Sequence, residues 1–433
     1  MYYFIGIKGS GMASLACILH DKGEEVQGSD IEKYIFTQDA LEERNIKILN
    51  FNENNIHDNM NVIIGNAFDK SNPEVAKALA NKTIRSYYYH EFLGEFLSNF
   101  TSVSIAGTHG KTTTTGMCSS LLDINKPTSY LIGDGTGYLQ NNSHYFVLES
   151  CEYQDHFLSY KPDYAIITNI DLDHVDYFKT LENCIKSFNK FANQVKKCVI
   201  LFGDDENIRS MEINTSCIYY GLGKNNDVYA DNIEYSSDGT KFDCYYKNKL
   251  YASFKTKLIG KHLLWNTLSI ITLGILENMS IEQIQLGLDN FQGVKRRFNI
   301  EEIDDYVYID DYAHHPTAIE LTIESARIKY PNKKIIAIYK PDRYSRLLAL
   351  IDEFASSLAK ADEVYLCDFA SNTKKEDGVD VSIEDLAKLI NNCEVISEDE
   401  NGAKILFESG PACYLFMSSK DIYKLKNIVK SFH

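Results

Sequence analysis

The sequence lacks an excess of positive charge. Its 44 lysine and arginine residues are outnumbered by 61 aspartate and glutamate residues, which gives a formal net charge of -17. Proteins that bind nucleic acids normally carry a basic surface, so this balance excludes a phosphate backbone as the main partner. Local basic loops can still hold the phosphates of a nucleotide.

Paired cysteines and long apolar runs are also missing. The ten cysteines are scattered from Cys17 to Cys413, with no CxxC pair and no zinc spacing, so we expect free thiols in a reducing compartment. No stretch approaches the roughly 20 apolar residues of a membrane span, and the start, MYYFIGIKGSGM, has no basic region before a long apolar run. We therefore expect a cytoplasmic enzyme or binding protein.

The 433 residues are enough for three domains of about 150 residues each. Apolar runs alternate with helical stretches, which is typical of parallel α/β sheets. This alternation begins at residues 2–7, restarts at 102–107 and again at 306–311, and residues 226–258 look rich in strands. Further strands are expected in the segments 24–30, 61–66, 145–150, 163–170, 197–203, 333–339, 362–369 and 412–417. We predict domains over residues 1–97, 98–294 and 295–433.

A loop rich in glycine and threonine follows the apolar strand at 102–107 and opens a predicted helix. Glycines let backbone N–H groups face an anion, and the helix N-terminus adds partial positive charge. Lys111 would reach the terminal phosphates of a nucleotide, and the Thr112 hydroxyl would bind Mg²⁺. Ile105 stands where the strict GxxxxGK[ST] pattern has glycine, so the loop is a shortened variant, and a glycine turn with a chance lysine is the alternative. The predicted ATP-binding loop comprises Gly107, Thr108, His109, Gly110, Lys111, Thr112 and Thr113.

Oxygen ligands for a magnesium nucleotide stand at the ends of the next two strands. The carboxyl ends of neighbouring parallel strands form one crevice, so these side chains are expected to gather near Lys111. Carboxylates suit Mg²⁺, whereas a histidine suggests a second, more adaptable cation site. Without a phosphate loop the same cluster would be an ordinary acidic loop. The candidate residues are Glu149, Asn169, Asp171, Asp173, His174 and Asp176.

A second glycine turn, residues 6–11, follows the first strand, and Asp30 lies downstream. The spacing invites a nicotinamide dinucleotide, but Lys8 occupies the second glycine position of that fingerprint, where a side chain obstructs the pyrophosphate. The diphosphate of a UDP-sugar fits the same loop without hydride chemistry. The third interpretation of this segment is a structural turn that binds no ligand.

Two motifs flank the start of the third predicted domain. One is the basic run Lys295 to Phe298, and the other is DDYAHHP at 310–316. Taken singly, the first is usually a solvated charge run and the second a helix start. Because they lie at a predicted domain junction, we expect them to approach the nucleotide when the domains close. An arginine would then contact the negative charge that develops on the phosphate, and Asp311 would contact the ribose or a metal-bound water.

Together these motifs resemble those of the Mur ligases, most strongly the members that act on UDP-N-acetylmuramate and L-alanine in Gram-positive bacteria. The resemblance implies three domains: a Rossmann-like N-terminal domain for the UDP-sugar, a central ATPase domain with a parallel sheet, and a C-terminal Rossmann-like domain for the amino acid. The segments that carry it are GIKGSGM, VQGSD, GTHGKTTTT, LIGDGTG, CEYQDHFLSYKPDYAIITNIDLDHVDYF, GVKRRF and DDYAHHP.

The resemblance also implies roles for individual residues. Lys111 and Thr112 would hold the ATP phosphates and Mg²⁺, Glu149 and His174 would be metal ligands, and Asn266 would contact adenine. The residues implied to approach ATP from the C-terminal domain are Arg297 and Asp311, with His314 nearby. Those implied on the UDP side are Gly9, Ser10, Gly11 and Asp30.

The implied reaction is ATP-dependent amide formation. The γ-phosphate of ATP would phosphorylate the muramate carboxylate, and the amine of L-alanine would attack the acyl phosphate. A free carboxylate is a poor electrophile, and its charge must be neutralised before phosphoryl transfer. Lys111, Mg²⁺ and Arg297 would supply that neutralisation.

The chain departs from the family pattern at two places. Asp342 stands where relatives usually have histidine, and Ser418, Ser419 and Lys420 stand in a segment that is usually rich in glycine. Both lie in the domain expected to choose the amino acid. The alternatives are therefore a ligase that adds another amino acid or a peptide, a nucleotide-binding protein without catalysis on the same scaffold, and a nicotinamide oxidoreductase.

Overall fold

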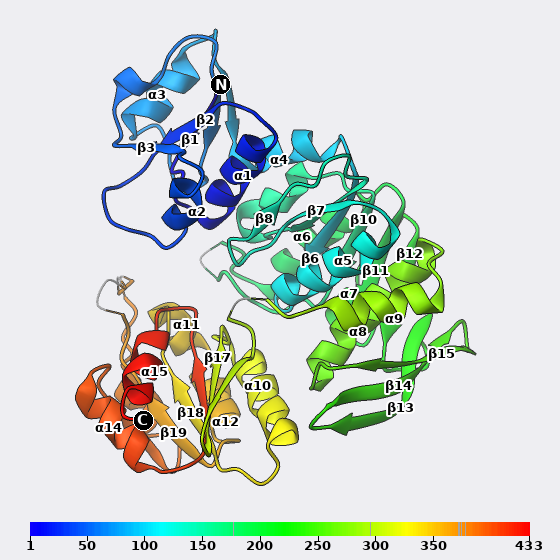
Figure 1. The fold of residues 1–433 in the computed structure, drawn as a ribbon, viewed down its shortest axis with the longest axis vertical. Helices are drawn as coiled ribbons and strands as arrows, with labels where there is room; N and C mark the ends of the chain where they lie inside the picture. The colour runs from blue at the N-terminus through cyan, green and yellow to red at the C-terminus, as the bar shows by residue number, and fades with distance from the viewer. Residues whose placement is uncertain (176, 295, 371–372, 374, 377) are drawn as a thin grey trace. The chain divides into compact units, whose positions relative to one another are not determined.

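The computed structural model describes residues 1–433 except 176, 295, 371, 372, 374 and 377 (Figure 1). Asp176 and Lys295, both named above as candidates, lie outside the described residues. The chain forms two compact units. The first comprises Met1–Asp231, Asp243–Ala252 and Trp265–Gln292, and the second comprises Asn232–Phe242, Ser253–Leu264 and Gly293–His433.

The first sheet is built from five parallel strands in the order β3-β2-β1-β4-β5. Its order reverses at β1, so the carboxyl ends of β1 and β4 open a crevice of the kind that binds nucleotides. The strands are β1 Tyr2–Ile5, β2 Val26–Ser29, β3 Lys47–Leu49, β4 Asn61–Ile64 and β5 Arg85–Tyr88, and the helices are α1 Ser10–Asp21, α2 Gln38–Glu42, η1 Glu53–Asn55, α3 Pro73–Ala80 and α4 Tyr89–Leu97.

The second sheet has ten strands in the order β15-β14-β13-β12-β11-β10-β6-β9-β7-β8. β6 lies in its parallel part between β10 and β9, and the runs of β6 and β10 are almost entirely buried. The strands are β6 Thr101–Ala106, β7 Thr128–Leu131, β8 Gly137–Tyr138, β9 Tyr145–Glu149, β10 Tyr164–Ile167, β11 Cys198–Phe202, β12 Cys217–Gly221, β13 Val228–Ser236, β14 Gly239–Tyr246 and β15 Lys249–Thr256. The helices are α5 Lys111–Asn125, η2 Tyr153–Ser159, α6 Leu181–Ala192, α7 Glu206–Arg209, α8 Lys261–Leu276 and α9 Ile281–Asn290.

The third sheet has six strands in the order β16-β17-β21-β18-β19-β20, with only β16 antiparallel to its neighbour. Alternate side chains of its central strands enter two separate cores, so helices cover both faces. The strands are β16 Asn299–Ile303, β17 Tyr306–Asp311, β18 Ile335–Tyr339, β19 Glu363–Leu366, β20 Cys393–Val395 and β21 Cys413–Met417. The helices are α10 Pro316–Lys329, α11 Tyr344–Ala349, α12 Ile351–Leu358, α13 Ile383–Ala387, α14 Glu400–Glu408 and α15 Tyr423–Lys430.

The structure confirms the predicted architecture of three α/β sheets, with parallel strands in each. The predicted boundaries near 98 and 295 fall between α4 and β6 and between α9 and β16; as domain limits they stay predictions. All ten cysteines are free thiols. Among the helices of the described residues, none is both long and apolar enough to cross a membrane.

Candidate active site

The loop between β6 and α5 has the backbone of an anion site. Gly107 and Gly110 have φ values of 132° and 83°, which side chains rarely adopt. A Cβ on Gly107 would also collide with the hydroxyl of Thr168. Gly110 precedes the first residue of α5 and offers no side-chain cap, and the first turn of α5 contains no acidic residue. The first amides of α5 therefore remain available to an anion, which the helix dipole also favours.

The end of β10 braces this loop. The Thr108 amide donates to the carbonyl of Asn169 at 3.1 Å, and the His109 amide donates to the Asn169 side chain at 2.8 Å. The Asp171 amide donates to the Thr108 hydroxyl at 2.9 Å, and His109 Nε2 lies 3.3 Å from the Asp171 carboxylate. Asn169 and Asp171, predicted as possible metal-side groups, thus contact the phosphate loop.

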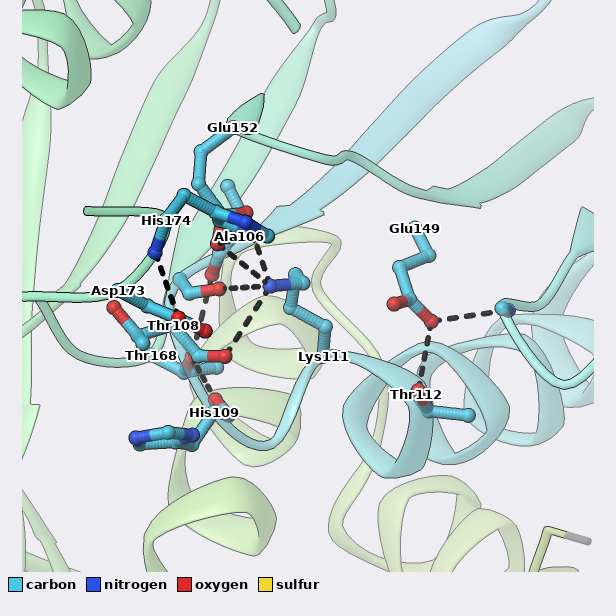
Figure 2. Close-up of polar contacts among 12 residues, drawn as sticks. Ala106, Thr108, His109, Lys111, Thr112, Glu149, Glu152, Thr168, Asp173 and His174 are labelled. Carbon is cyan, nitrogen blue, oxygen red and sulfur yellow. Dashed lines mark hydrogen bonds and ion pairs between the residues drawn. The ribbon is translucent and has the colours of Figure 1, made fainter. Parts of the chain in front are cut away.

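Lys111 folds back over its own loop (Figure 2). Its ammonium donates to the carbonyls of Gly107 and Thr108 and to both Glu152 oxygens, at 3.2 and 3.0 Å. The two side chains are only 13% and 2% exposed. Burial, the largest single effect, acts to lower the pKa of Lys111, but the negative charge of Glu152 and its neighbours outweighs it and raises the pKa above its usual value. Lys111 therefore stays charged.

Thr112 and Glu149 form an oxygen pair beside Lys111. The Thr112 hydroxyl donates to Glu149 Oε2 at 2.9 Å, and the Gly133 amide donates to the same oxygen at 3.0 Å (Figure 2). Neighbouring ligand oxygens around an octahedral Mg²⁺ with bonds of about 2.1 Å are about 3 Å apart, so this pair fits two adjacent Mg²⁺ positions. Gly133 is required for this approach, because a Cβ there would collide with the Glu149 carboxylate.

His174 lies next to Glu152 on the lysine side of this cluster. Its Nε2 is 3.8 Å from Glu152 Oε1, and its ring centroid is 4.7 Å from that of Tyr153. Its amide donates to the Asp173 carboxylate at 2.7 Å, and its φ of 51° is a left-handed value. Such a conformation costs about 1–3 kcal/mol and is concentrated at functional sites. His174 and Lys111 therefore both lie next to the Glu152 carboxylate.

Replacing Glu152 by glutamine is expected to destabilise the protein without nucleotide. Removal of one partner from a buried ion pair typically costs about 3–5 kcal/mol, because the other charge stays buried. A bound triphosphate would give the Lys111 ammonium a new counter-charge. Thermal unfolding should therefore show a lowered melting temperature for Glu152→Gln, and Mg²⁺ with ATP should recover most of the difference from the wild type. An equal deficit with and without nucleotide would show that Lys111 does not meet the phosphates.

Two further residues of the predicted ATP site lie in the same unit. Thr113 is buried in the first turn of α5, and Asn266, on α8, is 5% exposed. The Asn266 amide oxygen is 3.1 Å from the position that a Cβ on Gly110 would take. Asn266 therefore packs against the phosphate loop.

The glycine turn after β1 is rigidly held. The Lys8 amide donates to Asp30 at 2.7 Å, and the Lys8 ammonium donates to the carbonyls of Ile31 and Lys33 at 2.8 and 3.1 Å. Asp30 also accepts from the Ile31 amide at 2.8 Å and is buried. Gly9 precedes α1, which begins at Ser10 and has neither a side-chain cap nor an acidic first turn. Asp30 therefore fixes the turn that precedes α1. Like α5, α1 begins without a side-chain cap.

The second unit holds the remaining candidates. Arg297 lies over the Tyr312 ring at 4.8 Å, and His314 Nδ1 donates to the Tyr312 carbonyl at 2.8 Å. Asp311 accepts from the amides of Phe298 and Ala313, each at 2.8 Å. Burial raises the pKa of Asp311, while the Arg297 charge acts to lower it.

The two segments that depart from the family pattern contact each other in this unit, through Asp342 and Ser419. Asp342 accepts both contacts from Arg346, at 2.7 and 2.8 Å, and a hydrogen bond from the Ser419 hydroxyl at 3.0 Å. Burial favours the neutral acid, but the charges of Arg346 and His314 hold the pKa of Asp342 below its usual value. The sequence alone gave no sign of this pairing.

Comparisons with known proteins decide the family. The Mur ligase family catalytic domain matches residues 1–101, the Mur ligase middle domain matches 105–274, and the glutamate ligase domain of Mur ligases matches 296–408. The chain belongs to the Mur ligase family. Its predicted resemblance is thereby confirmed along most of its length.

Solved Mur ligases share the whole fold. The UDP-N-acetylmuramate–alanine ligase of Thermotoga maritima is 25% identical, with a TM-score of 0.82 over 100% of this chain and 98% of that one. A murein peptide ligase from Psychrobacter arcticus is 22% identical, with a TM-score of 0.70 over 99% and 98% of the two chains. The MurF ligase of Thermotoga maritima, solved with ADP, is 19% identical, with a TM-score of 0.67 over 94% and 95%. These last two show the fold alone.

Sequence reasoning missed two residues of this Mur ligase site. Glu152 stands three positions after Glu149 in a loop, and only the folded chain brings it to Lys111. Gly133 lies in LIGDGTG, a segment quoted for the resemblance without any role for its glycines. The acidic residue so close to a predicted metal ligand was the one available signal for Glu152.

Proposed function

We propose that this Mur ligase joins L-alanine to the carboxylate of UDP-N-acetylmuramate and converts ATP to ADP and phosphate. The observation that carries the proposal is the charged, buried Lys111 at an uncapped helix start, beside the Thr112–Glu149 oxygen pair. An ammonium, the amides of a helix start and carboxylate ligands are the groups that phosphoryl transfer needs.

The residues of the central sheet would bind ATP. The amides at the start of α5 would receive the outer phosphates, and Lys111 would exchange Glu152 for the γ-phosphate. Thr112 and Glu149 would hold Mg²⁺, with His174 close by, and the ion would neutralise charge on the phosphates. The MurF structure solved with ADP supports a nucleotide in this fold.

The turn before α1 would bind the diphosphate of the UDP-sugar. Gly9, Ser10 and Gly11 present the first amides of α1, and Asp30 fixes the turn from behind. A sugar acid held there would turn its carboxylate toward ATP. In the first step a carboxylate oxygen forms a bond to the γ-phosphorus of ATP, and ADP is released. In the second step the alanine amine attacks the acyl carbon, forms the amide and releases phosphate.

The choice of L-alanine is supported by the Thermotoga maritima enzyme, whose name gives alanine as its substrate. The murein peptide ligase shows that the same fold also serves peptides, so a peptide acceptor is the main alternative. The roles expected for Arg297, Asp311 and His314 stay predictions. The ten free thiols support a reducing compartment, and we place the reaction in the cytoplasm.

The test measures phosphate release from ATP with each substrate omitted in turn. We expect release to require Mg²⁺, UDP-N-acetylmuramate and an amino acid, with L-alanine preferred over glycine, L-serine and a tripeptide. Preference for the tripeptide would reassign the acceptor. Release that ignores the sugar would refute a ligase of this class, and a change in absorbance of a nicotinamide cofactor would refute it in favour of an oxidoreductase.

A further inference from the structure

Tyr89 stands at the carboxyl edge of the first sheet, as the first residue of α4 directly after β5. Its ring end packs on Gly11 in the first turn of α1. A Cβ on Gly11 would collide with the Tyr89 hydroxyl and lie 2.7 Å from its Cζ atom. The hydroxyl therefore lies directly at the uncapped start of α1, where the amides of Ser10 and Gly11 have no acceptor within the helix.

The same hydroxyl also lies within the electrostatic reach of Glu149. Burial raises the pKa of Tyr89, and the nearby Glu149 carboxylate raises it further. Cys151 and Glu149 lie at the end of β9, beside the phosphate loop. Tyr89 thus lies against the start of α1, and the charge of Glu149 acts on its hydroxyl.

The segment between β7 and β8 also connects the start of α1 with Glu149. Its Gly133 amide donates to Glu149 at 3.0 Å. Two residues later, the Gly135 carbonyl accepts from the Ser14 hydroxyl of α1 at 2.7 Å. The start of α1 and the carboxylate of Glu149 are therefore held by one short stretch of chain, and Tyr89 lies against the start of α1.

The hydroxyl of Tyr89 is available for a ligand. Among the residues that the structure describes, none forms a hydrogen bond with it. A tyrosine hydroxyl carries a proton that it can donate to an anion. A half-buried donor at the uncapped start of α1, within the electrostatic reach of Glu149, suits an anionic substrate that extends between them.

We propose that the Tyr89 hydroxyl donates a hydrogen bond to the diphosphate-linked sugar acid and holds it between the start of α1 and Glu149. This inference rests on the proposed function and deepens it, because it names a residue that sets the position of the acid relative to ATP. The oxygen that accepts belongs to the sugar substrate and not to ATP. The absence of a side chain at Gly11 then leaves room for the Tyr89 hydroxyl beside the turn that would bind the diphosphate.

The test is the Tyr89→Phe variant, which keeps the ring and removes only the hydroxyl. Hydrogen bonds to charged groups contribute about 1.5–3 kcal/mol, which corresponds to a rise of about 10-fold to 100-fold in KM for UDP-N-acetylmuramate. The KM for ATP and the melting temperature should stay at wild-type values. Tyr87→Phe is the matched control, since Tyr87 lies on β5 and its hydroxyl is near Glu95; it should keep both KM values.

An unchanged KM for the sugar in Tyr89→Phe would overturn the inference. Equal rises in both KM values, or a lowered melting temperature, would also overturn it, because they indicate a structural role. Wild-type enzyme that shows no sugar-dependent phosphate release would remove the proposed function itself, and that failure is visible before any variant is compared.

Discussion

Lys111→Ala is expected to lower kcat for phosphate release by about 10³-fold, a magnitude typical of losing one preorganised charge-stabilising group. The ammonium is buried, permanently charged and within reach of the loop that would cradle the phosphates. The measurement is steady-state release of phosphate with saturating sugar, amino acid and ATP.

Two controls separate chemistry from folding in this experiment. Lys126→Ala removes an exposed lysine at the other end of the same helix and should keep wild-type turnover. The double variant Lys111→Ala, Glu152→Ala removes both buried charges, so it should regain stability without regaining activity. Near-normal turnover in Lys111→Ala would show that the loop does not hold the reacting phosphates.

Glu149→Gln is expected to raise the Mg²⁺ concentration needed for half-maximal activity. Loss of even an outer partner of a metal ligand typically costs about 10-fold to 100-fold in metal affinity, so loss of a direct carboxylate ligand should cost at least as much. The Thr112 hydroxyl and the Gly133 amide would keep a neutral oxygen to contact. Turnover measured against Mg²⁺ concentration gives the shift directly.

The matched control for Glu149 is Glu234→Gln, which removes an exposed carboxylate on β13. It should leave the Mg²⁺ dependence unchanged. A Glu149→Gln enzyme with wild-type Mg²⁺ dependence and lowered kcat would mean that the carboxylate acts on a substrate and not on the ion.

The fold was most predictable where strands are buried on both faces. The strands β10 and β18 are continuous apolar runs, and each was expected near its observed place. Short strands at sheet edges were missed, among them β3 and β20, because three residues with polar neighbours carry no readable periodicity. Their pairing depends on the neighbouring strand, which a local pattern does not contain.

The candidate site shows the same division. The loop at Gly107 was predictable because strand, glycines and helix are adjacent in the sequence. The Lys111–Glu152 pair was not, because it joins residues 41 positions apart through packing that no local pattern encodes. Asp30 was predicted near a substrate from its spacing, and the structure shows its oxygens occupied by backbone amides. Spacing identified the place, and only the fold showed what each oxygen contacts.

The central claim is that the sugar carboxylate receives the outermost phosphate of ATP beside Lys111. It is tested most directly with UDP-N-acetylmuramate that carries ¹⁸O at both oxygens of its carboxylate. The account predicts that each phosphate released during amide formation contains one ¹⁸O atom, because the carboxylate oxygen that attacks phosphorus leaves with it. Released phosphate without ¹⁸O, alongside normal product formation, would contradict the account.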